Sequence, residues 1–256
     1  MLNENIKLRI NNLRGKIGIY YKDLTTEESL IVGNCDRFEC ASLIKLPVLI
    51  YVLKKIHEKQ ISPDDRITLE EKHKVPSCGA LTHMHPGLEV TVKDLYSLMM
   101  VLSDNTATNM LIEKFGMENI NNLMAKMGFK ETKINRLLFD EEKKQKGIQN
   151  YFSIMEIGKM LEEIYFKEMI SQEMSEEILD IMKELQRNYI MGYYFQEEIQ
   201  IAHNTDEDTN FLHDVGIVLG ERPFILCLAS NDIDPRKAET VMRDITLMCY
   251  KNSINE

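Results

Sequence analysis

Residues 40–56 read CASLIKLPVLIYVLKKI, and this stretch contains the most apolar run of the sequence. From Ser42 to about Ile56 the apolar side chains fall on nearly every side of a helix, so the spacing predicts a helix that is buried all round. Lys45 and Pro47 interrupt the run, which is also shorter than the roughly 20 residues that span a bilayer. We therefore expect a buried helix inside a globular protein and no membrane span.

Short β-type runs lie toward both ends of the sequence, and helical spacing fills the middle. The β-type runs cover residues 16–24, 29–33, 199–202, 214–219 and 224–229, and further helical patterns cover 90–102, 106–115, 117–127, 154–165, 173–187 and 235–250. Two amino-terminal strands pair most economically with three carboxy-terminal strands in one antiparallel sheet, covered by the first and last helices. The predicted fold class is α+β: an antiparallel sheet of about five strands from both termini, with an inserted all-α lobe.

The composition is that of an ordinary globular protein. The chain has 256 residues, of which 41 are acidic and 31 basic, giving a formal charge of −10. This length predicts a single domain over residues 1–256, with a sheet lobe at about 1–45 and 188–256 and a helical lobe at about 46–187. An acidic chain does not attract phosphate backbones or anionic lipid, so nucleic acid and membranes are not expected partners.

The amino-terminal residues and the cysteines favour a cytoplasmic location. Residues 1–16, MLNENIKLRINNLRGK, carry charges every few positions and lack the apolar stretch of a secretory signal. This expectation fails if Met1 replaces a removed leader. The cysteines are odd in number, form no C-x-x-C pair and are expected to be reduced thiols, mostly buried: Cys35, Cys40, Cys78, Cys227 and Cys249.

Ser42 and Lys45 are the first candidate catalytic pair. They are three residues apart, so in a helix the hydroxyl and the ammonium project from the same face. Pro47 is tolerated only in a first turn, which places Ser42 at or next to the helix amino end, where free N–H groups favour a developing negative charge. A buried lysine with a lowered pKa can serve as the base that activates a serine. The alternative is a helix N-cap followed by a lysine that snorkels to solvent.

A second motif, Ser103-Asp104-Asn105, lies between two helical patterns. By itself it is typical of a helix-terminating turn and N-cap. Together, ASLIKLP at residues 41–47 and LMMVLSDNTATNMLIEKFG at 98–116 resemble the class A β-lactamase and penicillin-binding protein superfamily. PGLEVTVKDLYSLM before the second motif and HDVGIVLGERPFILCLAS near the carboxy terminus also resemble that superfamily.

The resemblance implies a role for each residue of the two motifs. Ser42 would be the acylated nucleophile and Lys45 its proton acceptor, while Ser103 would relay a proton to the leaving nitrogen. Asn105 would hold Lys45 and a substrate amide. The backbone N–H groups of Ser42 and of about Glu207 would form the oxyanion hole.

The strand that lines the site departs from the superfamily pattern. Where the superfamily carries Lys-Thr-Gly, this chain has Asn204, Thr205 and Asp206. Asn204, Thr205 and Glu207 would contact the substrate. The absent lysine would bind a substrate carboxylate, a contact worth roughly 1.5 to 3 kcal/mol. Asp206, Glu207 and Asp208 would instead repel an anionic substrate.

The second departure lies in TKINRLLFDEEKKQKGIQNYFS, residues 132–153, the loop that supplies the deacylating glutamate in class A enzymes. Arg136 resembles the structural arginine of this loop, and the glutamate position falls on Leu138. The acidic residues that follow are out of register and fit a solvated turn beside lysines: Asp140, Glu141, Glu142, Lys143, Lys144 and Lys146. Without a base to activate water, an acyl-enzyme would form and persist.

Other features do not indicate a cofactor or a metal. His83-Met84-His85 has no Cys, Asp or Glu partner at ligand spacing, so it is interpreted as a loop and no metal or cofactor is expected. The 16 methionines are interpreted as flexible core filling. Cys40, two residues before Ser42, is expected to pack in the core, although a thiol so close to the site could be modified.

The sequence therefore indicates a β-lactamase-like serine hydrolase with an intact acylation half-site and weak or absent turnover of a small-molecule β-lactam, amide or ester. Alternatives are a penicillin-binding or peptidase-like acyl acceptor, an esterase, or a catalytically silent binding module. The segment Asn204 to Asp206 discriminates between an enzyme and a silent module, because an enzyme for carboxylate substrates should keep a cation there. Arg222 or Arg236 could supply that charge from elsewhere. The oligomeric state stays open.

Overall fold

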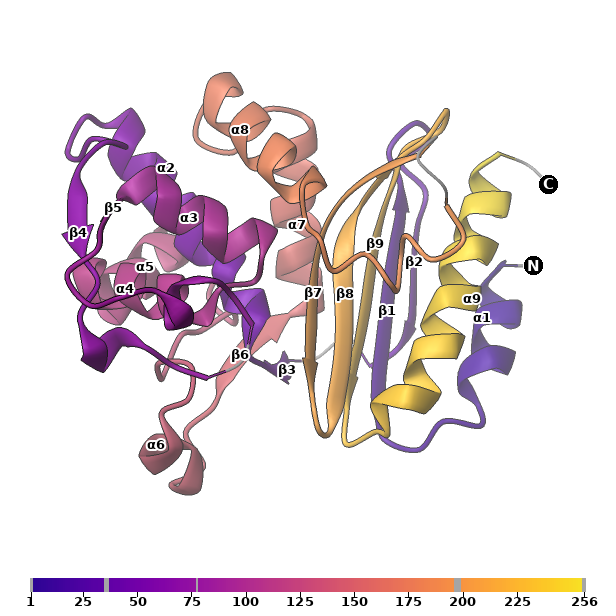
Figure 1. Ribbon diagram of the computed structural model, residues 1–256. Helices are drawn as coiled ribbons and strands as arrows, with labels where there is room; N and C mark the ends of the chain where they lie inside the picture. Colours follow the sequence, from indigo (N-terminus) through magenta and orange to yellow (C-terminus); the bar gives the residue numbers. More distant parts are fainter. Residues whose placement is uncertain (1, 35–36, 77, 196–198, 255–256) are drawn as a thin grey trace.

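The computed structural model describes residues 2–34, 37–76, 78–195 and 199–254. Within these residues an antiparallel sheet lies on one side of the molecule and a group of helices on the other (Figure 1). The strand order is β2-β1-β9-β8-β7, so strands from the two ends of the chain meet at the β1–β9 pair. Their bounds are β1 (Lys16–Asp23), β2 (Ser29–Gly33), β7 (Gln200–Asp208), β8 (Phe211–Leu219) and β9 (Phe224–Asn231). The predicted α+β class and the sheet built from both termini are confirmed.

The carboxy-terminal strands are longer than the sequence predicts. β7 continues to Asp208, and β8 already begins at Phe211, because the two pair without a break from Gln200↔Leu219 to Asp208↔Phe211. The polar residues of β7 obscured this strand, because strands are predicted from β-branched and aromatic residues. As a result, the whole segment from Asn204 to Glu207 lies on an edge strand.

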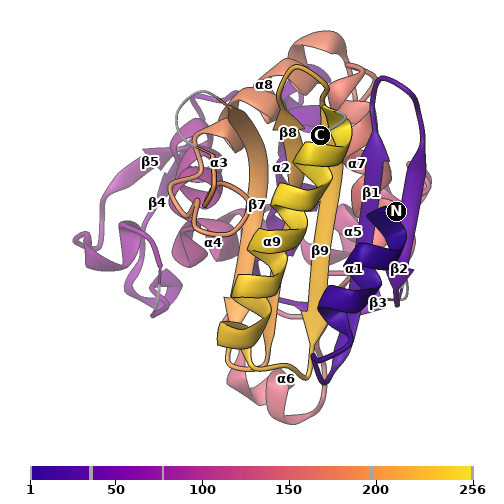
Figure 2. The same cartoon turned by 90° about the vertical axis from the view of Figure 1, so that its right-hand side faces the viewer.

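Two helices cover the outer face of the sheet, α1 (Leu2–Ile10) and α9 (Pro235–Ser253) (Figure 2). They bury Ile19 and Tyr21 of β1 together with Ile6 of α1. The sequence predicted α9, but α1 was missed because charges recur through its short span and obscure its apolar side. The two termini therefore lie on the same outer layer.

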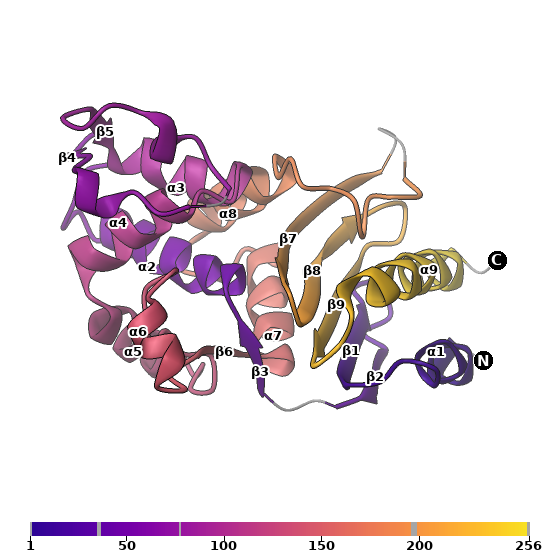
Figure 3. The same cartoon turned by 60° about the horizontal axis from the view of Figure 1, so that its bottom comes forward.

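The inner face of the sheet is covered by α7 (Ile154–Tyr165), which packs against β1, β8 and β9 (Figure 3). Gly158 allows this close approach, because a Cβ there would lie 2.4 Å from the ring of Tyr20. The expected cover, the apolar helix at residues 42–56, was wrong: α2 (Lys45–His57) instead packs among other helices. A helix that is apolar all round needs apolar partners on every side, whereas a sheet covers only one. Its neighbours are α3 (Val92–Val101), α4 (Asn105–Phe115), α5 (Met117–Lys126) and α8 (Gln172–Lys183).

The remaining elements are short, and among them β3 and β6 lie next to the turn of Ser42. Two small antiparallel pairs, missed in the sequence, are β3 (Arg37–Cys40) with β6 (Asn150–Ser153) and β4 (Arg66–Thr68) with β5 (Glu89–Thr91). Single helical turns are η1 (Ser42–Ile44), η2 (Glu71–His73) and η3 (Leu81–His83), and α6 (Glu141–Gln145) lies below the helices in Figure 1. None of the described helices combines the length and the apolar composition that crossing a bilayer requires.

Candidate active site

Ser42 is the first residue of η1, the turn that joins strand β3 to helix α2. Phe38 and Cys40 of β3 are buried, and their pairing with β6 fixes how the chain enters this turn. Pro47 is the third residue of α2, where its missing N–H forfeits no helical hydrogen bond. The hydroxyl of Ser42 therefore stands at the amino end of a buried helix.

The ammonium group of Lys45 lies at the centre of a cluster of oxygen atoms. Its Nζ is 2.9 Å from Ser42 Oγ, 2.6 Å from Ser103 Oγ, 2.8 Å from the Ser103 carbonyl oxygen and 3.1 Å from Asn105 Oδ1. The two hydroxyl oxygens of Ser42 and Ser103 are 3.3 Å apart. Lys45 is 0% exposed, so its ammonium does not snorkel to solvent.

The Ser103-Asp104-Asn105 segment combines a helix cap with contacts to Lys45. Asp104 is the N-cap of α4 and accepts a hydrogen bond from the backbone N–H of Ala107 at 2.9 Å. Ser103 has a φ of 55°, a left-handed conformation that is uncommon for a non-glycine residue. This turn directs both Ser103 and Asn105 toward Lys45. Adjacent residues therefore cap helix α4 and bind Lys45.

Burial changes the acid–base behaviour of Lys45. Removal from water disfavours the ammonium and lowers the pKa of Lys45 to about 7, although the negative charges of Asp206 and Asp104 partly oppose this shift. Near neutral pH a large fraction of Lys45 is therefore a free amine. Such an amine, 2.9 Å from Ser42 Oγ, can accept the hydroxyl proton.

Ser42 opens into a cavity of about 190 Å³ between the helices, the sheet edge and the segment that carries Leu138. Charged groups of both signs line it together with a thiol and apolar side chains. The lining residues are Ala41, Ser42, Cys78, Ser103, Asn105, Arg136, Leu138, Phe139, Glu141, Lys144, Arg187, Asp206, Glu207 and Asp208.

Strand β7 is joined to the turn of Ser42 by two side chains. Asn204 Nδ2 donates to the Ser42 carbonyl oxygen at 3.2 Å. Asp206 Oδ2 accepts from the backbone N–H groups of Ala41 at 2.7 Å and Leu43 at 3.3 Å. Because Asn204 and Asp206 are two residues apart on a strand, they lie on the same face. Both side chains are nearly fully buried.

The sequence suggested that the acidic end of β7 presents free negative charge to the cavity. In the structure these acids have partners. Glu207 Oε2 accepts from Arg187 Nη2 at 3.0 Å and from the Tyr189 hydroxyl at 2.6 Å. Asp208 Oδ2 lies 3.7 Å from Lys144 Nζ. The Thr205 hydroxyl donates to the carbonyl oxygen of Arg187 at 3.1 Å. The carboxylates are thus engaged with cations or backbone N–H groups.

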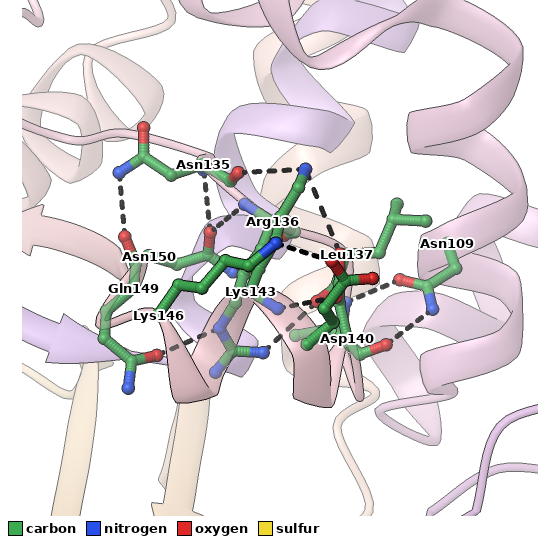
Figure 4. A network of polar contacts seen from close by, with 11 residues as sticks. Asn109, Asn135, Arg136, Leu137, Asp140, Lys143, Lys146, Gln149 and Asn150 are labelled. Carbon is green, nitrogen blue, oxygen red and sulfur yellow. Dashed lines mark hydrogen bonds and ion pairs between the residues drawn. The ribbon is translucent and has the colours of Figure 1, made fainter.

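The segment carrying Leu138 is held by amide side chains (Figure 4). Asn109 donates to the Leu138 carbonyl oxygen and accepts from its N–H, both at 2.9 Å. Asn150 Oδ1 accepts from the N–H of Arg136 at 3.0 Å, and Arg136 Nε donates to Gln149 Oε1 at 2.9 Å. The side chain of Leu138 is 3% exposed and forms part of the cavity wall.

The acidic residues after Leu138 are mostly engaged in local contacts. Asp140 is the N-cap of α6 and accepts from the backbone N–H of Lys143 at 3.0 Å (Figure 4). Glu142 pairs with Lys146 one turn further along. Of the three acids, Glu141 alone is among the residues that line the cavity in the described chain.

Comparison with known proteins identifies the family. A family model described as the β-lactamase enzyme family matches residues 1–253. The chain belongs to this family. Among curated relatives, β-lactamase SME-1 of Serratia marcescens is 24% identical over 135 residues, which is 52% of this chain and 46% of that protein. β-Lactamase ROB-1 of Haemophilus influenzae is 30% identical over 125 residues, 48% of this chain and 40% of that protein. These alignments span less than half of each relative.

Several solved structures match the whole fold. PBP-A is 25% identical with a TM-score of 0.91, covering 100% of this chain and 96% of that one. The β-lactamase from Sphaerobacter thermophilus is 24% identical with a TM-score of 0.89, covering 100% and 97%. A PBP-A variant with one leucine replaced by glutamate, solved as an acyl-enzyme complex with penicillin G, has a TM-score of 0.89 at 25% identity.

Arg187 is a cavity residue that the sequence did not reveal. Because α8 ends at Lys183, not at residue 187, Arg187 lies in the connection that returns to β7. Besides binding Glu207, its Nη1 lies 3.7 Å from Cys78 Sγ. No local pattern marks this residue, since its position depends on contacts between distant segments. Cys78 and Lys144, which also line the cavity, were missed for the same reason.

The other basic and histidine candidates lie elsewhere. Arg222 donates to the Ser253 carbonyl oxygen, and Arg236 lies at the start of α9; neither is among the described residues that line the cavity. His83 and His85 lie at and after the short turn η3. Among the described residues, no group of three or more His, Cys, Asp or Glu side chains could hold a metal ion.

Proposed function

We propose that this chain is a β-lactamase-type serine hydrolase that is acylated at Ser42 by β-lactams or related amides and esters. The observation that carries this proposal is the contact of 2.9 Å between Ser42 Oγ and Lys45 Nζ, with Lys45 fully buried and its pKa lowered to about 7 by that burial. A serine next to a free amine at the mouth of a cavity is the arrangement required for nucleophilic acyl transfer.

Acylation would use the residues around Lys45 in a defined order. Neutral Lys45 takes the proton of Ser42 as Oγ forms a bond to the substrate carbonyl carbon. Backbone N–H groups of Ser42 and Glu207 stabilise the oxyanion. When the carbon–nitrogen bond breaks, the proton returns through the Ser103 hydroxyl to the leaving nitrogen, while Asn105, which lines the cavity, holds the substrate. Asn204 and Thr205 are buried and support the site through the carbonyl oxygens of Ser42 and Arg187.

Turnover is proposed to be slow because Leu138 cannot activate water. Its side chain occupies the cavity wall and has no group that accepts a proton. Losing a positioned general base typically reduces a rate by roughly 10² to 10⁴. The leucine-to-glutamate replacement in PBP-A is of the kind that Leu138→Glu would make here.

A penicillin-binding or peptidase-like acyl acceptor is the second candidate, and the same observation at Leu138 favours it. Such a protein also forms an acyl adduct at serine but need not hydrolyse β-lactams quickly. The two candidates differ in the fate of the adduct. Rapid loss of a β-lactam adduct supports the hydrolase. An adduct that is lost rapidly only when it derives from a peptide-like ester supports the acyl acceptor.

Intact-mass measurement tests the proposal. The chain is incubated separately with a chromogenic cephalosporin and with a fluorophosphonate. Wild type should gain one adduct from each, Ser42→Ala none, and Ser29→Ala, a change at an exposed serine on β2, the same adducts as wild type. Equal labelling of the Ser42 and Ser29 variants would reject Ser42 as the nucleophile, and absence of labelling in wild type would favour a silent binding module.

A further inference from the structure

Asp206 is the charged residue that lies closest to the nucleophile turn without belonging to the pattern of the family. Its carboxylate is 1% exposed and accepts hydrogen bonds from two backbone N–H groups of that turn, at Ala41 and Leu43. In the described part of the chain it forms no ion pair with a nitrogen within 4.0 Å. A buried carboxylate in this position needs either a nearby positive charge or several N–H donors.

The neighbour across the sheet does not supply that positive charge. His213 pairs with Asp206 in the register of β7 and β8. Burial lowers the pKa of His213 to about 4. His213 Nδ1 accepts from the Ser230 N–H, which leaves Nε2 to donate to the Glu39 carbonyl oxygen. His213 is therefore neutral at physiological pH, and its two ring nitrogens are occupied.

Lys45 lies next to the turn that Asp206 holds, because Ser42 stands between Ala41 and Leu43 and its Oγ is 2.9 Å from Lys45 Nζ. Among the groups around Lys45, Asp206 opposes the effect of burial most strongly, followed by Cys78 and Asp104, whereas Arg187 acts in the opposite direction. Asp104 is already committed to capping α4. Burial therefore lowers the pKa of Lys45, and the charge of Asp206 opposes part of that shift.

We propose that Asp206 is a positioning residue for the Ser42–Lys45 pair, which anchors the turn of Ser42 and keeps a negative charge beside Lys45. Asp206 lines the cavity and at the same time holds the turn of Ser42 through two backbone N–H groups. This inference rests on the proposed function, because it concerns the base of the acylation step. The expected effect of Asp206 on the titration of Lys45 does not require that a substrate is turned over.

The decisive experiment measures the titration of Lys45 directly. Protein carrying lysine labelled with ¹³C at Cε is titrated by NMR, and the Lys45 resonance is assigned by its absence in Lys45→Met. Wild type should titrate near pH 7. Asp206→Asn keeps the shape and removes the charge, so its midpoint should fall by roughly one pH unit, the lower end of the effect of a nearby opposite charge. Asp208→Asn, the same change on the same strand, should shift it much less.

Acylation provides the second readout. The pH midpoint of the fluorophosphonate labelling rate should fall in Asp206→Asn by the same amount as the Lys45 titration. An unchanged or raised NMR midpoint in this variant overturns the inference. A shifted NMR midpoint with no labelling of wild-type Ser42 instead rejects the proposed function and leaves the role of Asp206 intact.

Wild type alone supplies a further check that does not depend on the variant folding. Buried lysines without a compensating charge titrate at about pH 5 to 6. A wild-type Lys45 midpoint in that range would show that Asp206 does not sustain the ammonium, and the inference would fail.

Discussion

Replacing Leu138 by glutamate should convert a persistent acyl adduct into one that hydrolyses. Leu138 is held in place through its backbone by Asn109, and its side chain already lines the cavity into which Ser42 opens. A carboxylate there would be well placed to activate water. A positioned general base is worth roughly 10² to 10⁴ in rate, and we expect Leu138→Glu to accelerate deacylation within that range.

The same change should destabilise the fold. Leu138 is 3% exposed, and giving up the burial of a leucine costs about 1.5 to 3 kcal/mol. For a chain of this size each kcal/mol lowers the melting temperature by roughly 2 to 4 °C, which gives a loss of about 3 to 12 °C. Burial also raises the pKa of the new carboxyl, so deacylation should quicken as the pH rises.

The assay is a single-turnover measurement. Each variant is acylated with penicillin G, excess ligand is removed, and loss of the adduct is followed by intact mass. Leu138→Gln is the matched control, because it removes the same apolar contact and has nearly the same shape but cannot accept a proton. The reasoning is refuted if the Glu and Gln variants lose the adduct at equal rates, or if wild type already loses it within a second.

Three further predictions concern the groups around the nucleophile. Because burial lowers the pKa of Lys45 to about 7 and its neutral form is the base, the wild-type acylation rate should rise through about pH 7 and then level off; a continued rise beyond pH 9 in stopped-flow labelling would contradict this. Arg187→Met should slow acylation by carboxylate-bearing penicillin G about tenfold, the loss of one charge-assisted contact, with less effect on a neutral fluorophosphonate. Arg222→Met, away from the cavity, is its control, and equal effects of the two variants would argue against a role for Arg187. Asp206→Gly leaves two backbone N–H groups of the turn without their acceptor, each worth about 1 to 3 kcal/mol, so calorimetry should show a clearly lower melting temperature than for Asp208→Gly; matching values would disprove the anchoring contact.

Local spacing predicts that Ser42 and Lys45 meet, because both belong to one turn of chain. Ser42 and Lys45 are three residues apart, and Pro47 marks the start of the helix that carries them. The sheet was predictable from β-type runs at the two ends of the sequence, since strands must pair with other strands. Helix α1 was missed, because charges interrupt its apolar side.

Contacts between distant segments were beyond prediction from residue types. The expected repulsion by the acids of β7 assumed that their charges have no partners. These acids line the cavity, but Asp206 accepts from the N–H groups of Ala41 and Leu43, and Glu207 binds Arg187 from the connection after α8. A sequence gives the charge of each side chain, but the partner that neutralises it depends on the fold.

These contacts change how the family pattern should be restored. Asn204→Lys would place an amine on the same face of β7 as Asp206, so the introduced lysine would find a carboxylate partner and lose only one bond to the Ser42 carbonyl oxygen. Asn204→Lys acts on binding and should raise kcat/KM, whereas Leu138→Glu acts on deacylation and should raise kcat. We expect the double variant, with Asp206 retained, to hydrolyse a carboxylate-bearing β-lactam with a higher kcat/KM than Leu138→Glu alone. Adding Asp206→Gly completes the Lys-Thr-Gly motif but removes the anchor of the nucleophile turn. The triple variant should therefore melt at a lower temperature than the double variant, and a triple variant of equal stability and greater activity would show that Asp206 only obstructs the substrate.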